Sequence, residues 1–197
     1  MPRAALSDVE VERFRDALCD VATRLFAQKG YDGVTMRALA AELGCSPIRP
    51  YRYFENKDEI FEAVRRAAFD RFADALAEAR DSTRDPLGRM QALCLGYVRF
   101  ALDEPHAYRI MFELDPPSGT RPPDAEEARS WLVMRECVED AVRAGVLRGD
   151  ADVLAHLYWS TVHGMVALHL AGKLVLGRGL EELTRAFMER ELRGDAR

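Results

Sequence analysis

Hydrophobic residues recur at helical spacing along most of the chain. The first stretch predicts a helix that begins after Ser7 or Asp8, both good capping residues, and ends at Lys29-Gly30. Its apolar side chains follow the i, i+3, i+4, i+7, i+11 rule for a single helix face: Phe14, Ala17, Leu18, Val21 and Leu25.

Two short helices and a long one are predicted next. Thr35 caps a helix that reaches Glu42 and closes on Leu43-Gly44, and Ser46-Pro47 has the cap-then-proline pattern of a further helix start, which predicts a helix over residues 48–54. Asn56 is the expected cap of the long helix, which keeps an apolar face to about residue 80, and Glu59 stands at its capping-box position.

The remaining pattern is also helical. Asp85-Pro86 opens a helix that breaks at Asp103-Glu104-Pro105, and a shorter helix over 106–114 follows. The proline-rich residues 115–123 are the clearest predicted loop, and further helices end at Gly145, run from Asp150 to residue 170, and span 179–192. Because no alternating strand pattern and no internal repeat occur, we expect an all-α fold of about nine helices.

Composition narrows the class of protein. No apolar run reaches the ~18 residues of a membrane-spanning helix, and the charged first residues do not resemble a signal peptide, so we expect a cytoplasmic protein without a membrane partner. The cysteines are far apart and form no CxxC pair, which disfavours zinc sites and disulfide frameworks. We expect the four cysteines to be small buried hydrophobic residues, and a redox-sensing role for one of them is the alternative. They are Cys19, Cys45, Cys94 and Cys137.

Charge is unevenly distributed. The whole chain carries −5, yet the stretch from Arg24 to Lys57 holds six positive and three negative side chains, a net +3. A basic segment on an acidic body is compatible with site-specific DNA binding.

The short helices have the layout of a helix-turn-helix. Gly44 supplies the tight turn, and Leu39, Leu43 and Ile48 are expected to pack against the first helix so that the next helix can enter the major groove. Phe54 is expected in the core. The predicted DNA-facing residues are Thr35, Arg37, Ser46, Pro47, Arg49, Tyr51, Arg52, Tyr53 and Lys57. For Arg37 and Arg49 the alternative is an ordinary solvent-exposed arginine.

The segments TMRALAAELGCSP (35–47) and YRYFENKDEI (51–60) resemble the DNA-binding domain of the TetR family of regulators, over about residues 14–61. The resemblance implies a homodimer on a palindromic operator and a helical C-terminal domain that binds a ligand and dimerises through the last two helices. It divides the chain into a DNA-binding domain (1–55) and a ligand-binding and dimerisation domain (56–197). Pro50 and Ile48 depart from the family pattern, since an aliphatic residue and a glycine are usual there.

The C-terminal part resembles the TetR subgroup named for a Trp-His-Gly signature, here Trp159, His163 and Gly164. Aromatic, methionine and histidine side chains of this region suit an apolar pocket with a few polar groups. Plain core packing is the alternative for the 106–112 set, and a hydrogen-bonded histidine under Trp159 is the alternative for His163. The candidate ligand-binding residues are Tyr97, Phe100, His106, Tyr108, Met111, Phe112, Met134, Trp159 and His163.

These observations predict a DNA-binding repressor that a small, largely apolar effector releases from its operator, with no metal, cofactor or catalytic residues. The alternative is a helical ligand-binding protein whose operator recognition has decayed, with Pro50 and Ile48 as its signs. An enzyme is the third reading, and no Ser-His-Asp grouping or phosphate loop supports it.

Overall fold

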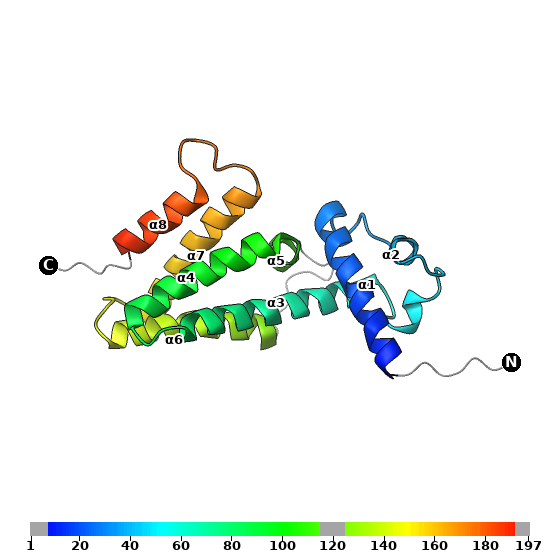
Figure 1. Cartoon of the computed structure of the whole chain (residues 1–197), viewed down its shortest axis with the longest axis horizontal. Helices are drawn as coiled ribbons and strands as arrows, with labels where there is room; N and C mark the ends of the chain where they lie inside the picture. The colour runs from blue at the N-terminus through cyan, green and yellow to red at the C-terminus, as the bar shows by residue number, and fades with distance from the viewer. Residues whose placement is uncertain (1–7, 115–124, 192–197) are drawn as a thin grey trace. The chain divides into compact units, whose positions relative to one another are not determined.

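A computed structural model describes residues 8–114 and 125–191, and the all-α prediction is confirmed for these residues. Ser7, the predicted loop 115–123 and residue 192 lie outside the described residues. The described part contains eight α-helices and one 3-10 helix (Figure 1): α1 (Asp8–Lys29), α2 (Met36–Glu42), η1 (Pro50–Arg52), α3 (Lys57–Asp81), α4 (Pro86–Asp103), α5 (Pro105–Phe112), α6 (Ala125–Arg143), α7 (Ala151–Leu170) and α8 (Leu180–Glu191).

The helices group into two compact units. Among the described residues, unit 1 comprises 8–68 and 106–114, and unit 2 comprises 69–105 and 125–191. The chain therefore enters unit 2 within α3, returns to unit 1 for α5, and leaves again for α6, α7 and α8.

An aromatic cluster holds the core of unit 1. The Phe61 ring of α3 meets the rings of Phe26 and Tyr31 edge-on, with centroids 5.1 and 5.3 Å apart. All three side chains are buried, together with Leu39 of α2 and Ile110 of α5. Since buried aromatic side chains remove large apolar areas from water, this cluster fixes α1 against the start of α3.

Polar contacts at the start of α3 complete this junction. The Tyr31 hydroxyl donates to the Asp58 carboxylate, and burial, followed by that carboxylate, raises the pKa of Tyr31. Asn56 caps α3 as predicted, with its Oδ1 accepting from the Glu59 backbone N–H at 2.9 Å. The Glu59 carboxylate returns to the N–H of Glu55 rather than to that of Asn56, one residue earlier than in a capping box.

The turn after α2 follows the prediction. Thr35 caps α2 by accepting from the Ala38 N–H at 3.1 Å. Gly44 has a φ of +62°, a conformation that costs a glycine little, and the Cys45 N–H then donates back to the Ala40 carbonyl.

The expected α-helix over 48–54 is wrong: this segment forms turns and the three-residue helix η1. Pro50 is the reason, because it has no N–H to donate to the Ser46 carbonyl, which lies four residues earlier. That carbonyl instead accepts from the Arg49 N–H at 2.9 Å, and the Tyr53 N–H bonds the Pro50 carbonyl at 3.0 Å. Both are the shorter i→i+3 bonds of a 3-10 turn, so eight α-helices form rather than about nine.

The packing expected of Ile48 is also wrong. Its side chain is 69% exposed, whereas Pro50, Tyr53 and Phe54 are buried. Side chains three residues apart in a 3-10 turn lie on the same side, so Pro50 and Tyr53 share the inner side and Ile48 is left outside.

Helix α4 is central to unit 2. It packs against α6, α7 and α8, and it buries six side chains: Met90, Leu93, Cys94, Tyr97, Phe100 and Ala101. Its C-terminal end is tied to α3 by Arg71, whose Nε and Nη2 donate to one Glu104 carboxylate oxygen at 3.0 and 2.7 Å.

Helices α3 and α4 approach closely at Gly96. A Cβ added to this glycine would lie 2.7 Å from the Cβ of Ala79, which belongs to a short, rigid side chain. We predict that Gly96→Ala lowers the free energy of unfolding of unit 2 by about 1–3 kcal/mol, through overpacking. Urea unfolding followed by tryptophan fluorescence measures this unit, because both tryptophans, Trp131 and Trp159, lie in it.

The double variant Gly96→Ala/Ala79→Gly is the matched control. Ala79→Gly alone should cost about 1 kcal/mol of helix propensity. In the double variant the clash is gone, so its loss should be smaller than the sum of the two single losses. Additive losses would contradict a close contact between these helices.

Candidate functional site

The predicted DNA-facing residues are mostly on the surface of unit 1. Arg49 precedes η1 and Arg52 is its last residue. The side chain of Tyr51, between them, is 54% exposed. Seven of the nine are exposed: Thr35, Arg37, Ser46, Pro47, Arg49, Tyr51 and Arg52. Helix α2 and η1 contact each other, so the cap of α2 and the 3-10 turn belong to one part of unit 1.

Tyr53 does not belong to this exposed set. Its side chain is 8% exposed, its ring lies 4.4 Å from that of Phe14, and its hydroxyl is buried without a hydrogen-bond partner among the described residues. The 3-10 geometry turns Tyr53 inward beside Pro50, so this side chain is placed in the packing between α1 and the turn rather than towards DNA.

Lys57 has a fixed position at the start of α3. Its Nζ donates to the Tyr31 carbonyl at 3.1 Å and lies 3.9 Å above the centre of the Tyr31 ring. A lysine ammonium has three donors, so donors remain for a phosphate. The phosphate contact of Lys57 stays a prediction.

Two further arginines of unit 1, Arg24 and Arg15, join α1 to residues on and after α2, and the sequence pattern did not indicate their partners. Arg24 pairs with Glu42 across α1 and α2, and this hydrogen bond and its charge lower the pKa of the Glu42 carboxyl. Arg15 donates to the Tyr53 carbonyl at 2.8 Å, and its guanidinium carbon lies 4.3 Å above the Phe54 ring. Only the fold brings α1 to these partners.

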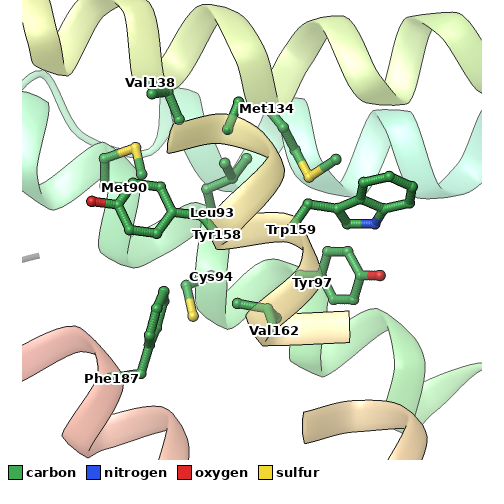
Figure 2. Close-up of a pocket in the computed structure, with 11 residues that line it drawn as sticks. Met90, Leu93, Cys94, Tyr97, Met134, Val138, Tyr158, Trp159, Val162 and Phe187 are labelled. Carbon is green, nitrogen blue, oxygen red and sulfur yellow. The ribbon is translucent and has the colours of Figure 1, made fainter. Parts of the chain in front are cut away.

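Unit 2 contains a small cavity between its helices. Figure 2 shows the lining side chains converging from four helices. Helix α4 supplies Met90, Leu93, Cys94 and Tyr97; the others are Met134 and Val138 from α6, Ala155, Tyr158, Trp159 and Val162 from α7, and Phe187 from α8.

The cavity has a volume of about 30 Å³ and an almost wholly apolar lining. That volume is close to one water molecule's share of the liquid, about 30 Å³, whereas ligand pockets usually measure roughly 300–1,000 Å³. A ligand can enter only if side chains move. Met90 and Met134 are suited to this, because methionine is unbranched and adapts to irregular spaces.

A polar pair lies at the edge of the cavity. The Tyr97 hydroxyl and His163 Nδ1 are 3.1 Å apart, and the His163 and Trp159 ring centres are 6.3 Å apart. This places a hydrogen-bonding group beside an otherwise apolar lining. His156, one turn before Trp159, is exposed and rests on the Trp131 ring instead.

The structure brings together some of the predicted ligand-binding residues and separates others. Tyr97, Met134 and Trp159 line the cavity, and His163 bonds to Tyr97. Phe100 is buried but packs on Phe72, with ring centres 5.0 Å apart, outside the lining.

The four predicted residues of α5 do not line this cavity, so their ligand contact stays a prediction. Tyr108 and Met111 are buried, Phe112 is half-buried and His106 is exposed, all in unit 1. The helix break at Pro105 is the physical reason, because the chain leaves unit 2 there. Core packing therefore describes Tyr108 and Met111.

The prediction also missed most of the lining. Helical periodicity placed several of these residues on inward faces, but every core residue has the same pattern. The missed residues are Met90, Leu93, Cys94, Val138, Ala155, Tyr158, Val162 and Phe187.

Comparison with known families assigns both parts of the chain. Residues 18–64 match the family "Bacterial regulatory proteins, tetR family", and residues 90–193 match "Tetracyclin repressor-like, C-terminal domain". The chain belongs to the TetR family. It is therefore a DNA-binding transcriptional regulator of a family that is not enzymatic.

Curated relatives of this TetR-family chain include both a transcriptional activator and a transcriptional repressor. It is 28% identical over 154 residues to the transcriptional activator FasR of Mycolicibacterium smegmatis, covering 78% of this chain and 68% of FasR. It is 23% identical over 152 residues to the transcriptional repressor KstR2 of Mycobacterium tuberculosis, covering 73% and 74% of the two chains.

A solved relative shares the fold of this TetR-family chain. The structure of AibR in complex with isovaleryl coenzyme A and operator DNA superposes with a TM-score of 0.71 at 20% identity, covering 90% of this chain and 97% of AibR. Within the described residues, no helix combines the length and apolarity needed to cross a bilayer. The same residues place no three His, Cys, Asp or Glu side chains together as metal ligands.

Cys94, in the cavity lining, provides a chemical test of burial at this site. Burial raises the pKa of its thiol from 9.0 to about 12. Because the thiolate is the nucleophile, we predict that iodoacetamide at pH 8 alkylates Cys94 about a thousandfold more slowly than an unperturbed thiol, with the rate rising about tenfold per pH unit towards pH 11. Peptide mass spectrometry measures this, and the urea-unfolded chain is the control. Equal rates in the folded and unfolded chain would show that the cavity is open.

Proposed function

We propose that this TetR-family regulator binds a palindromic operator as a homodimer and represses transcription until a small, largely apolar effector enters the cavity of unit 2. The observation that carries the proposal is the apolar cavity edged by the Tyr97–His163 pair, in a chain whose other unit is a DNA-binding module. Such a regulator acts in the cytoplasm, where operator DNA is.

The exposed residues around η1 support the operator contact. Arg37, Arg49 and Arg52 offer donors to base edges or phosphates, and the Thr35 hydroxyl can still donate while it accepts from the Ala38 N–H. Residues 1–55 form the DNA-binding part in this proposal, and 56–197 the effector-binding and dimerising part.

An effector with a short acyl group suits the cavity. AibR was solved with isovaleryl coenzyme A, and the lining found here is apolar with adaptable methionines. The Tyr97–His163 pair supplies the polar contact that would orient a carbonyl or similar group beside this lining. Isovaleryl coenzyme A is therefore a first probe.

We also assign the chain to the Trp-His-Gly subgroup. Two residues of the signature support this assignment, because Trp159 lines the cavity and His163 bonds to Tyr97. An added Cβ at Gly164 would meet nothing within 4 Å, so no part of this chain's described residues crowds it.

Two continuous connections can carry the effector signal. Helix α3 runs unbroken from unit 1 into unit 2. Helix α4, which lines the cavity, leads directly into α5, where Arg109 donates to the Ala27 carbonyl near the end of α1 at 2.5 Å. A shift of α4 on effector binding would act on the DNA-binding unit through these elements, which is coupling between two sites.

The dimer is proposed through α7 and α8. Helix α7 presents Val153, Leu157 and Leu168 at exposures of 56%, 57% and 49%, with Thr161 and Gly164 between them on the same helical face. Contiguous exposed apolar side chains mark an interaction site, and the open space at Gly164 leaves room for a partner helix.

The operator and the effector are tested together. We predict that the purified protein retards a DNA fragment from upstream of its own gene at low salt, and that isovaleryl coenzyme A lowers this affinity. By linkage, the fragment must lower the affinity for isovaleryl coenzyme A by the same factor, measured by calorimetry. Failure to bind the upstream DNA, with effector binding retained, would favour the helical ligand-binding protein instead.

Ala155→Val is the matched variant for this experiment. It adds two methyl groups to the cavity wall, so it should leave DNA binding intact and weaken the response to isovaleryl coenzyme A at least tenfold. An undiminished response would place the effector elsewhere.

Dimerisation has its own test. Leu157→Asp puts a charge on the exposed α7 face and should convert a dimer into a monomer by light scattering at micromolar concentration. Leu132→Asp, at a 45% exposed leucine on α6, should remain a dimer. A monomeric wild-type protein, or equal behaviour of the two variants, would contradict this interface.

A further inference from the structure

Helix α1 and the turn around η1 are joined by two reciprocal arginine–aromatic contacts. The guanidinium carbon of Arg49, in the turn, lies 4.3 Å above the ring of Phe14 on α1. The guanidinium carbon of Arg15, on α1, lies 4.3 Å above the ring of Phe54 after the turn. The Phe14–Tyr53 ring pair at 4.4 Å and the Arg15–Tyr53 carbonyl bond at 2.8 Å lie between them.

This arrangement leaves the hydrogen-bonding capacity of Arg49 unused. Within the described part of the chain, its side chain has no hydrogen-bond acceptor and no carboxylate at ion-pair distance, and it is exposed. A guanidinium stacks on an aromatic ring with its flat side, while its N–H groups lie in its own plane. The ring can therefore restrict the arginine without occupying its donors.

Restriction matters because the turn is not a helix. A recognition α-helix would fix the direction of its side chains through its backbone bonds, but Pro50 prevents that here. A free arginine loses rotamer entropy when it binds a base, and holding it beforehand reduces that cost.

We infer that Phe14 is a specificity-determining positioning residue: it presents the Arg49 guanidinium to the N7 and O6 of a guanine in the operator, while Arg15 clamps the other side of the turn. The inference rests on the proposed operator binding. It assigns α1 an indirect part in base selection, through residues that position Arg49 and themselves touch no base.

The test uses a duplex enriched from random-sequence DNA by the wild-type protein and a scrambled duplex of the same composition. Phe14→Leu keeps an apolar side chain but removes the ring. We expect it to lower the ratio of selected to scrambled affinity about tenfold, within the range of one bidentate arginine–guanine contact, with an unchanged salt slope. Phe14→Tyr retains the ring and should retain the ratio.

A double-mutant cycle separates presentation of Arg49 from general loosening of the turn. Arg49→Ala should lower the ratio by the same factor, and Phe14→Leu should then have no further effect in the Arg49→Ala background. Additive effects, or an equal loss of affinity for both duplexes, would overturn the inference. Thermal unfolding of each variant reports any loss of fold, and the cycle remains readable at a temperature where all are folded.

Two more measurements sharpen the result. Replacing a single guanine by 7-deazaguanine removes its N7 acceptor. At one position in each half-site, this replacement should lower the DNA affinity of the wild-type protein but not that of Arg49→Ala. Arg15→Gln should lower the ratio, whereas Arg13→Gln, an exposed neighbour on α1, should lower both affinities slightly and equally. The inference would be overturned if 7-deazaguanine affected the wild-type protein and Arg49→Ala equally at every position, or if Arg15→Gln and Arg13→Gln had equal effects. A wild-type protein that selects no duplex would instead refute the proposed operator binding.

Discussion

A single missing backbone donor shapes the DNA-binding unit. Pro50 cannot bond the Ser46 carbonyl, so the segment that would be a recognition helix closes as a 3-10 turn. The turn buries Pro50 and Tyr53, exposes Ile48, and leaves Arg49 beside Phe14. The Arg49–Phe14 and Arg15–Phe54 contacts join this segment to α1, and we infer that they hold it in place of helical hydrogen bonds.

Unit 2 is organised around a different constraint, the burial of one face of α4. Four side chains of this helix form a wall of the cavity, and they meet α6, α7 and α8. The cavity has a volume of about 30 Å³, about one water molecule's share of the liquid. An effector that enters this cavity, as we propose, has to displace packed side chains, and close packing transmits such displacements instead of absorbing them. A helix that both lines the cavity and continues into α5 is well placed to transmit them.

The sequence anticipated the fold well wherever local signals agreed. Thr35, Asn56, Asp85 and Asp150 begin or cap helices as predicted, because a cap and its helix are neighbours in the chain. Pro50 is the exception: a proline is tolerated in the first turn of a helix, and local rules alone did not decide whether the helix would form around it. The seven exposed residues around the turn were also recognisable, since their motif is local.

The candidate sites required more than local signals. Tyr97 and Met134 line the cavity and Tyr108 and Met111 do not, yet all four have the same apolar character and helical spacing. The break at Pro105 decides which unit each joins, and periodicity does not encode where a helix goes after a break.

The sequence by itself determined the all-α class, the helix caps at Thr35, Asn56, Asp85 and Asp150, the TetR-family DNA-binding motif and the donors it exposes, because each depends on residues close together in the chain. Only the tertiary structure decided the partners of Arg15, Arg49 and His163, the composition of the cavity, and the placement of α5 in unit 1. These depend on which distant surfaces pack together, and packing is selected by the shape and volume of whole helices rather than by the identity of single residues.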